Sequence, residues 1–552
     1  MVLSASGWRA VFADHDEALT ATISLVHRDL LALATQLYLK SLPAGPVLVA
    51  TDTRPTGTAI AEVVLRTCLW LERTPKYLGV AAAPEVYAHA EQTACAGFVY
   101  VSASHNPIGH NGLKLGDPNG GVLHRAAALD LIDAFTRQVD DQRNIERIVD
   151  GLAATTVPEA LRDTAAQKQA ALASYREVLL ASAVGKDKPH ALRSMGAFFA
   201  RNPCGVVEDY NGSARAASLD AALLTDINVA FAGINDQPGV IAHQILPEGA
   251  GLAEAAKTLG ALRSTDPHFA FAFTPDNDGD RGNIVFPEGE VLDAQSVFAL
   301  AVTIELAWAR HNGAEQLAVA ANGPTSIRID RICRRYDAQL HRAEVGETNV
   351  VQLGRQLREA GYTCPIMGEG SNGGTILYPA RVRDPLATVL ALLKARAFAL
   401  FGADGSDYHA MVQSLPRFAT LETDDSRAKM QIGSCSHAAL KQQYEALLPE
   451  ALPAIASQLA PSFGTLDHTV MNYEGSQTRV GTGNRSGAQT GGLRVVFSDA
   501  QGIDRASVWM RGSGTEPVFR VLADVEGDDP QLLDQLIAWQ RDLVARSVAA
   551  VG

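Results

Sequence analysis

Short apolar runs alternate with amphipathic stretches along most of the chain. The runs are rich in β-branched and aromatic residues and end in polar turns, which is typical of buried strands. They cover residues 46–50, 99–101, 204–210, 269–274 and 317–321. Helical periodicity follows the first run, over residues 58–71. Strand, polar turn and helix in succession predict α/β domains.

Two of these runs lead into the same local pattern. Residues 204–210 are followed by Asn211-Gly212 and a helix, and residues 317–321 by Asn322-Gly323 and a helix. The two patterns lie roughly a hundred residues apart, which indicates successive domains of similar α/β build.

The remaining segments differ in character. Residues 122–190 are rich in Ala, Leu, Arg, Glu and Gln and predict helices, and residues 385–401 predict a helix that ends a third domain. Residues 462–492 are rich in Ser, Thr, Gly and Asn and predict strands with long loops. An amphipathic helix at residues 532–544 should pack on that sheet. The last part of the chain is therefore a domain of another kind.

Composition narrows the class of protein. Of the 552 residues, 47% are apolar and 20% are charged, which is ordinary for a soluble chain of several domains. The formal charge of −14 argues against a nucleic acid or an anionic membrane as partner, since both require clustered Lys and Arg. An anionic substrate would need local basic groups set against that charge.

Cysteine usage and the N-terminus bear on location. The six cysteines show no Cys-x-x-Cys spacing, so we expect buried free thiols in a reducing compartment. Charged residues between Arg9 and Glu17 interrupt any apolar signal segment. The most apolar helical stretch, residues 297–309, contains Glu305 and is too short to span a bilayer. We expect a cytoplasmic protein.

The stretch 99–114 carries the first candidate chemistry. Its apolar run breaks into small and polar residues with Asn-Pro and Asn-Gly turn formers. The strand end presents the Ser104 hydroxyl, and His105 and Lys114 are close enough in sequence to share the loop. A serine flanked by His and Lys suits a nucleophile or a phosphoryl carrier, although ordinary turn chemistry explains the same residues.

A second loop follows the run 269–274 and holds Asp276, Asp278 and Asp280 at alternating positions. These carboxylates can converge on one hard cation. A solvated acidic turn and a calcium loop are the alternatives, but Val285 stands where a calcium loop needs its glutamate. A proline-led loop directly after an apolar strand favours Mg²⁺, held by few protein ligands and a phosphate.

Two later loops suit a sugar and a phosphate. Residues 367–374 place four glycines around Glu369 and Ser371, so backbone, carboxylate and hydroxyl groups can contact vicinal hydroxyls. Alone, this pattern also fits a flexible loop. Residues 508–517 place two glycines, two hydroxyls and Arg511 between apolar strands, which suits a phosphate cradle.

Together these loops resemble those of one family. Residues 104–107 (Ser-His-Asn-Pro) with 111–114 (Asn-Gly-Leu-Lys) resemble the phosphoserine loop of the α-D-phosphohexomutase superfamily, the phosphoglucomutases, phosphomannomutases and their aminosugar relatives. The aspartate loop with its following Arg281 resembles the family's metal loop. The segments 368–371 and 511–517 resemble its sugar and phosphate loops, in the family's usual order. The resemblance spans nearly the whole chain.

The resemblance implies three similar mixed α/β domains and a C-terminal α+β domain around a central cleft. In order, we expect domains for the phosphoserine loop, the metal, the sugar and the far phosphate. Their expected limits are residues 1–170, 171–292, 293–415 and 416–552. Four loops from four domains imply some movement of the last domain.

The resemblance also implies a role for each loop. Ser104, as a phosphoserine, would supply the phosphoryl group and one oxygen ligand to Mg²⁺. The other expected metal ligands are Asp276, Asp278 and Asp280. The residues expected to act in acid–base chemistry or near the transferring group are His105, Lys114, Arg9 and Arg281. The expected substrate-binding residues are Glu369 and Ser371 for the sugar and Arg511, Ser513, Gly514 and Thr515 for the far phosphate.

The implied reaction interconverts a hexose 1-phosphate and a hexose 6-phosphate through a 1,6-bisphosphate, which also serves as activator. Glucose is the expected sugar. A phosphomannomutase or an aminosugar mutase stays open, because Asn372, Gly373 and the surroundings of Thr348 depart from the usual pattern. A Mg²⁺-dependent sugar phosphatase and a non-catalytic phosphosugar-binding protein also stay open. We expect hexose phosphates as partners and a monomer or weak homo-oligomer.

Overall fold

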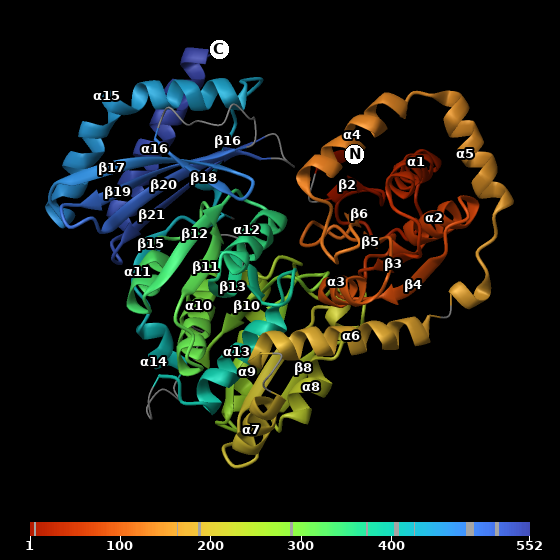
Figure 1. Cartoon of the computed structure of the whole chain (residues 1–552), viewed down its shortest axis with the longest axis horizontal. Helices are drawn as coiled ribbons and strands as arrows, with labels where there is room; N and C mark the ends of the chain where they lie inside the picture. Colours follow the sequence, from red (N-terminus) through yellow and green to blue (C-terminus); the bar gives the residue numbers. More distant parts are fainter. Residues whose placement is uncertain are drawn as a thin grey trace. The chain divides into compact units, whose positions relative to one another are not determined.

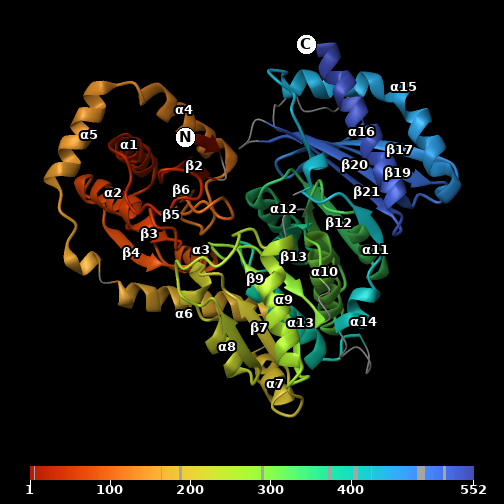
Figure 2. The ribbon, with the colours of Figure 1, turned by 180° about the vertical axis from the view of Figure 1, so that it is seen from behind.

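The computed structural model describes residues 1–551 except 5–6, 163, 186–188, 288–290, 371–373, 402–407, 424, 482–490 and 514–517. The chain forms two compact units. The first comprises Met1–Leu292 and Ile376–Phe398, and the second comprises Asp293–Thr375 and Ala399–Gly552. Figures 1 and 2 show the course of the chain through both units.

The first sheet of unit 1 has the strand order β1-β2-β6-β5-β3-β4. Its strands are β1 (Val2–Ser4), β2 (Gly7–Val11), β3 (Val47–Thr51), β4 (Pro75–Val80), β5 (Gly97–Val101) and β6 (His110–Gly116). Strand β3 pairs in parallel with β4 and β5, whereas β6 pairs antiparallel with β5 and β2. The predicted strands at 46–50 and 99–101 correspond to β3 and β5.

Helices cover both faces of this sheet (Figures 1 and 2). They are α1 (Leu25–Ser41), α2 (Gly57–Trp70), α3 (Ala83–Gln92), α4 (Arg125–Gln138) and α5 (Gln142–Ala154). Because side chains alternate along a strand, Val99 and Val101 join the core with α1 and α2, whereas Phe98 and Tyr100 join the core with α3. A strand buried on both faces explains why β5 is a continuous apolar run.

The second sheet of unit 1 has the order β10-β9-β7-β8. Its strands are β7 (Gly205–Asp209), β8 (Ala230–Ile234), β9 (Phe269–Pro275) and β10 (Gly282–Val285). Unit 1 also contains α6 (Ala165–Val184), α7 (Pro189–Phe199), α8 (Asp220–Asp226), α9 (Ala253–Arg263) and α13 (Pro385–Ala397). The helix predicted to follow Asn211-Gly212 begins as a short 3₁₀ turn, Ala214–Ala217, and α8 comes only after it.

The third sheet lies in unit 2 and has the order β12-β11-β13-β14. Its strands are β11 (Leu317–Asn322), β12 (Ala338–Ala343), β13 (Thr363–Glu369) and β14 (Gly374–Leu377), with the last two residues of β14 assigned to unit 1. Helices α10 (Ala294–His311), α11 (Arg328–Arg335), α12 (Glu347–Glu359) and α14 (Tyr408–Gln413) belong to the same unit.

These three sheets share one strand order, and the candidate loops occupy equivalent places in it. The order β6-β5-β3-β4 of the first sheet matches β10-β9-β7-β8 and β14-β13-β11-β12. The Ser104 loop joins β5 to β6, the aspartate loop joins β9 to β10, and the Glu369 loop joins β13 to β14. Each loop therefore follows the carboxyl end of a parallel strand, where ligands bind in open α/β sheets.

The fourth sheet also lies in unit 2 and is antiparallel, with the order β15-β21-β20-β19-β17-β18 and β16 beside β21. Its strands are β15 (Phe418–Thr420), β16 (Lys429–Met430), β17 (Leu466–Glu474), β18 (Gln477–Val480), β19 (Gly492–Asp499), β20 (Asp504–Gly512) and β21 (Phe519–Glu526). Helices α15 (His437–Phe463) and α16 (Pro530–Val551) share its apolar core. The terminal amphipathic helix was predicted, whereas α15 was not.

The fold class expected from the sequence is confirmed: mixed α/β sheets precede a C-terminal α+β part. The limits expected for the four domains stay a prediction. All six cysteines are free thiols; five are buried as predicted, but Cys435 is half-buried. Among the helices in the described ranges, none combines the length and apolar character of a membrane span.

Candidate active site

Ser104 lies just beyond β5 in a conformation that few non-glycine residues adopt. Its φ is +55°, and the residue is only 1% exposed. Its backbone N–H donates to Ser102 Oγ at 2.9 Å, and its Oγ donates to Asp276 Oδ2 at 2.8 Å. Left-handed backbone at a serine persists only where surrounding contacts hold it, and such positions concentrate at functional sites.

Arg54 binds the backbone of the Ser104 loop. Its guanidinium is 2% exposed and donates to the carbonyls of Ser104 at 2.7 Å, Asn106 at 2.5 Å, His110 at 2.9 Å and Pro107. A carboxylate of Asp52 lies 3.2 Å from Arg54 Nε and balances the buried charge. Sequence reasoning treated residues 51–57 as an ordinary turn and missed this residue.

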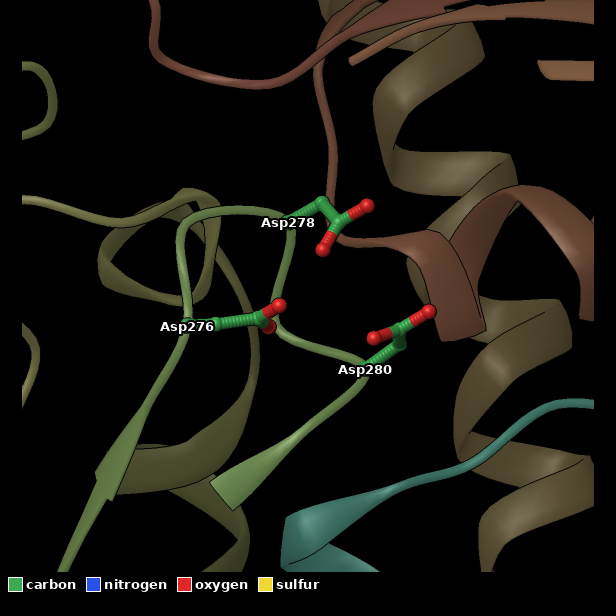
Figure 3. Close-up of side chains that lie close together, drawn as sticks. All are labelled: Asp276, Asp278 and Asp280. Atoms are coloured by element: carbon green, nitrogen blue, oxygen red, sulfur yellow. The ribbon is translucent and has the colours of Figure 1, made fainter. Parts of the chain in front are cut away.

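The three carboxylates of the aspartate loop face a common space, as Figure 3 shows. One oxygen from each of Asp276, Asp278 and Asp280 lies within 4.8 Å of the others, and all three residues are buried. Among the described residues, Asp278 Oδ1 and Asp280 Oδ1 have no hydrogen-bond partner. Buried carboxylate oxygens without a partner are costly, and three oxygen donors fit a hard divalent cation such as Mg²⁺.

Two hydroxyls of the Ser104 loop join it to the aspartate loop. Besides the bond from Ser104 to Asp276, Ser102 Oγ donates to Asp278 Oδ2 at 2.9 Å. Strand β5 and strand β9 belong to different sheets of unit 1, so these bonds fix the two loops against each other. The arrangement brings the expected carrier serine directly to the expected metal ligands.

Cations neutralise part of the aspartate cluster. Lys114 Nζ lies 2.5 Å from Asp278 Oδ2 and 3.3 Å from Asp280 Oδ2, and Arg383 Nη2 lies 2.9 Å from Asp280 Oδ2. Arg281 Nε is 3.9 Å from Asp280 Oδ1. Burial alone would raise the pKa of Asp280, but Arg383, Lys114 and Arg281 outweigh it and hold that pKa below its usual value. Arg383 carries no sequence signal and was not predicted.

The pKa of Asp276 is shifted in the opposite direction to that of Asp280. Burial and then the neighbouring Asp278 and Asp280 raise the pKa of Asp276 well above its usual value. Burial lowers the pKa of Lys114, but Asp278 and Asp280 more than reverse this and raise it. The cations of the cluster therefore do not balance its negative charge at Asp276. A further cation bound there would balance it.

Buried nitrogen atoms of His105, which follows Ser104, and of two arginines whose charges act on His105 have no hydrogen-bond partners among the described residues. They are Arg9 Nε, Arg281 Nε and His105 Nδ1, all buried atoms. Arg9 lies on β2 opposite Gly112 of β6. Burial, followed by the charges of Arg281 and Arg9, lowers the pKa of His105 well below its usual value, so this imidazole is neutral at pH 7. Unsatisfied donors beside a serine suit an anionic group such as phosphate.

A buried arginine, Arg215, binds the backbone of the aspartate loop. Arg215 Nη1 donates to the carbonyl of Gly279 at 3.2 Å and to Asp384 Oδ1 at 3.2 Å, and Arg215 Nε donates to Asp220 Oδ1 at 2.7 Å. Gly279 has a φ of +70°, and a Cβ atom there would overlap the Arg215 side chain. Only glycine therefore allows this turn between Asp278 and Asp280.

In unit 2, Glu369 ends β13 and is buried. Its Oε1 accepts hydrogen bonds from Asn322 Nδ2 at 3.1 Å and from the backbone N–H of Gly346 at 2.7 Å. The Asn322-Gly323 turn after β11 and the turn after β12 therefore both position this carboxylate. Ser371 lies outside the described residues.

Arg511 and Ser513 lie at the end of β20. Arg511 Nε is 3.8 Å from Glu344 Oε1, and Glu344 belongs to the same turn as Gly346, which binds Glu369. Glu369 and Arg511 thus both lie beside the turn that follows β12. Gly514 and Thr515 lie outside the described residues.

Comparisons with known proteins agree with this arrangement. Family models for the phosphoglucomutase/phosphomannomutase α/β/α domain I and domain III match residues 2–142 and 297–417. A Thermococcus kodakarensis protein named phosphoglucomutase/phosphomannomutase is 23% identical over 505 residues, 90% of each chain. A Methanopyrus kandleri protein named probable phosphoglucosamine mutase is 23% identical over 515 residues, 92% of each chain.

Solved structures share the fold. The Paramecium phosphoprotein parafusin, described as a phosphoglucomutase, is 15% identical and superposes with a TM-score of 0.64 over 99% of this chain and 97% of its own. The matching domain models, the relatives of similar length and the fold lead to one family: this chain belongs to the α-D-phosphohexomutase superfamily.

Proposed function

We propose that the protein is a phosphohexomutase that interconverts hexose 1-phosphates and hexose 6-phosphates through a phosphorylated Ser104 and a hexose 1,6-bisphosphate. The observation that carries this proposal is the position of Ser104 Oγ, 2.8 Å from Asp276 Oδ2 of the buried aspartate cluster. Phosphoryl transfer needs a carrier, charge neutralisation and positioning, and these residues provide each.

The aspartate cluster is the proposed Mg²⁺ site, with Asp276, Asp278 and Asp280 as ligands and Ser104 as the fourth protein group. When Mg²⁺ is bound there, it offsets the negative charge of the transferring phosphoryl group. Arg9 and Arg281 would hold the phosphoryl oxygens through their guanidinium groups.

His105 and Lys114 have different proposed roles in the transfer. His105 has a lowered pKa and is neutral, so it can accept a proton from the attacking hydroxyl. Lys114 has a raised pKa and stays charged, so it can donate a hydrogen bond to the transferring group and stabilise its charge.

The loops of unit 2 would bind the rest of the substrate. Glu369 would accept hydrogen bonds from sugar hydroxyls, together with Ser371. Arg511, Ser513, Gly514 and Thr515 would bind the phosphate that is not being transferred. One position would hold the phosphate that reacts with Ser104, and the other would bind the second phosphate. The bisphosphate could then reorient and return its other phosphate to Ser104.

Glucose phosphates are the proposed substrates, and glucosamine phosphates are the second candidate. The Methanopyrus kandleri relative, which covers nearly the whole chain, bears the aminosugar name, and this favours testing both. Mannose differs from glucose only at C2, and glucosamine carries an amine there. No motif in the chain supplies an obvious contact to that position.

A coupled assay tests the proposal. Glucose 1-phosphate, glucosamine 1-phosphate and mannose 1-phosphate would be supplied with Mg²⁺ and a trace of the matching bisphosphate. We expect conversion to the 6-phosphate with no net release of inorganic phosphate. Free phosphate as the main product would indicate a phosphatase instead, and no turnover of any of the three would contradict the proposal.

A further inference from the structure

A lysine on α15 lies in the region of unit 2 where the expected phosphate loop begins. Lys441 is 1% exposed, and its Nζ donates to the carbonyl of Gly491 at 2.7 Å. A lysine is rarely buried to this extent unless a nearby anion or hydrogen-bond acceptor stabilises it. Nothing in the sequence pattern marked this residue.

His437 fixes the position of Lys441 relative to the phosphate loop. It precedes Lys441 by four residues, so both side chains lie on one face of α15. A Cβ atom on Gly512 would overlap the His437 ring, which shows that the ring lies directly against the backbone of Gly512. Gly512 follows Arg511. The first turns of α15 therefore pack on the end of β20.

Charged side chains from several elements act on Lys441. Burial lowers the pKa of Lys441 to about 8; Glu344, Glu445 and Glu474 oppose the shift, and Arg511 adds to it. Lys441 and Arg511 therefore repel each other electrostatically, and both are attracted to Glu344. Lys441 therefore lies within electrostatic range of Arg511, the residue at the start of the expected phosphate loop, and Glu344 is a carboxylate near both.

We propose that Lys441 binds, together with Arg511, the substrate phosphate that is not being transferred. The inference rests on the proposed phosphohexomutase function and adds to it a residue from an element outside the recognised loops. A phosphate dianion next to Lys441 would stabilise its protonated form. Binding should therefore weaken as the pH rises through about 8, where the free protein loses this proton.

The test uses the full chain with Ser104→Ala to prevent turnover. Calorimetry would measure the affinity for glucose 1-phosphate, with unphosphorylated glucose as the ligand control. We expect Lys441→Met to weaken glucose 1-phosphate binding about 10- to 100-fold, the range for a charge-assisted hydrogen bond. Lys429→Met, at an exposed lysine of the same sheet, is the matched control and should leave the affinity unchanged.

Lys441→Arg separates binding from a structural role and remains informative if Lys441→Met does not fold. Because arginine keeps its charge, the fall in kcat/KM above pH 8 expected for the otherwise unmodified enzyme should disappear in this variant. Unchanged affinity in Lys441→Met, or identical pH profiles for lysine and arginine, would overturn the assignment of Lys441. Absence of hexose phosphate binding before Lys441 is changed would instead overturn the proposed function.

Discussion

Several basic side chains lie in the region of Ser104, although the net charge of the chain is −14. Lys114 and Arg383 pair with the aspartate cluster, while Arg9 and Arg281 keep buried nitrogen atoms without hydrogen-bond partners among the described residues. The sequence required local cations if the substrate is anionic, and these four side chains meet that requirement. Burial and these paired cations distinguish the aspartate cluster from a solvated acidic turn.

Removal of one carboxylate tests the metal site. We expect Asp278→Asn to weaken Mg²⁺ binding by about tenfold or more and to slow turnover by two orders of magnitude or more, because a buried ligand is lost and Lys114 keeps only one partner. Calorimetry with Mg²⁺ and the mutase assay would measure both. Asp266→Asn, at a partly exposed aspartate that precedes β9, serves as the control. Full activity after exhaustive chelation would contradict the assignment.

Glu369 tests sugar recognition. If its carboxylate accepts a hydrogen bond from the 4-hydroxyl, galactose 1-phosphate, in which that hydroxyl is inverted, should be a much poorer substrate than glucose 1-phosphate. Mannose 1-phosphate should be used more slowly than glucose 1-phosphate, by roughly ten- to two-hundred-fold. Comparison of kcat/KM for the three sugars in the unmodified protein and in Glu369→Gln checks this. Equal values for galactose and glucose would exclude the contact.

At the level of elements, the Ser104 loop depends on the hydrogen bonds of Arg54, which we call the Arg54 clamp. This clamp joins the loop after β3 to the loop after β5. Arg54, after β3, donates to backbone carbonyls from Ser104 to His110, after β5. The strands β3 and β5 are parallel neighbours, so their carboxyl ends bring the two connections together. These bonds explain how Ser104 keeps a positive φ.

Arg54→Lys tests the clamp. An ammonium group cannot reproduce the fork of a guanidinium, so most of the carbonyl bonds should be lost. We expect kcat to fall about 100-fold while the far-ultraviolet circular dichroism stays the same. Arg73→Lys is a matched control, because Arg73 also donates to backbone carbonyls, those of Leu39, Leu42 and Pro43, but away from this loop. Equal loss in both variants would refute a specific role for Arg54.

The sequence predicted the strands and the residues that directly follow them. The runs 99–101 and 269–274 are apolar because both faces of their strands are buried, and polar residues after them are visible as abrupt breaks. Arg54, Arg383 and Lys441 could not be predicted, because each acts through tertiary contacts with segments distant in sequence, and a single arginine or lysine in a chain has no pattern.

Helix α15 was missed for a different reason. It contains Pro449, Pro453 and Pro461, which normally argue against a helix, and Figure 1 shows it as a curved ribbon. Its buried face still follows a helical spacing of three or four residues. The residues on that face include Leu440, Tyr444, Leu448, Ala451, Ile455 and Leu459. Burial of this stripe on the last sheet outweighs the loss of hydrogen bonds at the prolines.

At the scale of the whole molecule, the expected chemistry is divided between units that are not continuous in sequence. Unit 1 holds Ser104 and the aspartate cluster, and unit 2 holds Glu369 and Arg511. The segment Ile376–Phe398 returns to unit 1 and supplies Arg383 to the cluster. The proposed reaction needs both sets of residues, and its defining event is the transfer of a phosphoryl group to one serine.

The site of that phosphoryl group decides whether Ser104 is the carrier. The full-length protein would be incubated with Mg²⁺ and glucose 1,6-bisphosphate, and intact-mass and peptide mass spectrometry would locate the modification. We expect one phosphoryl group, on Ser104, and loss of both the modification and mutase turnover in Ser104→Ala. Phosphate found only on Ser102, or unchanged turnover in Ser104→Ala, would contradict it.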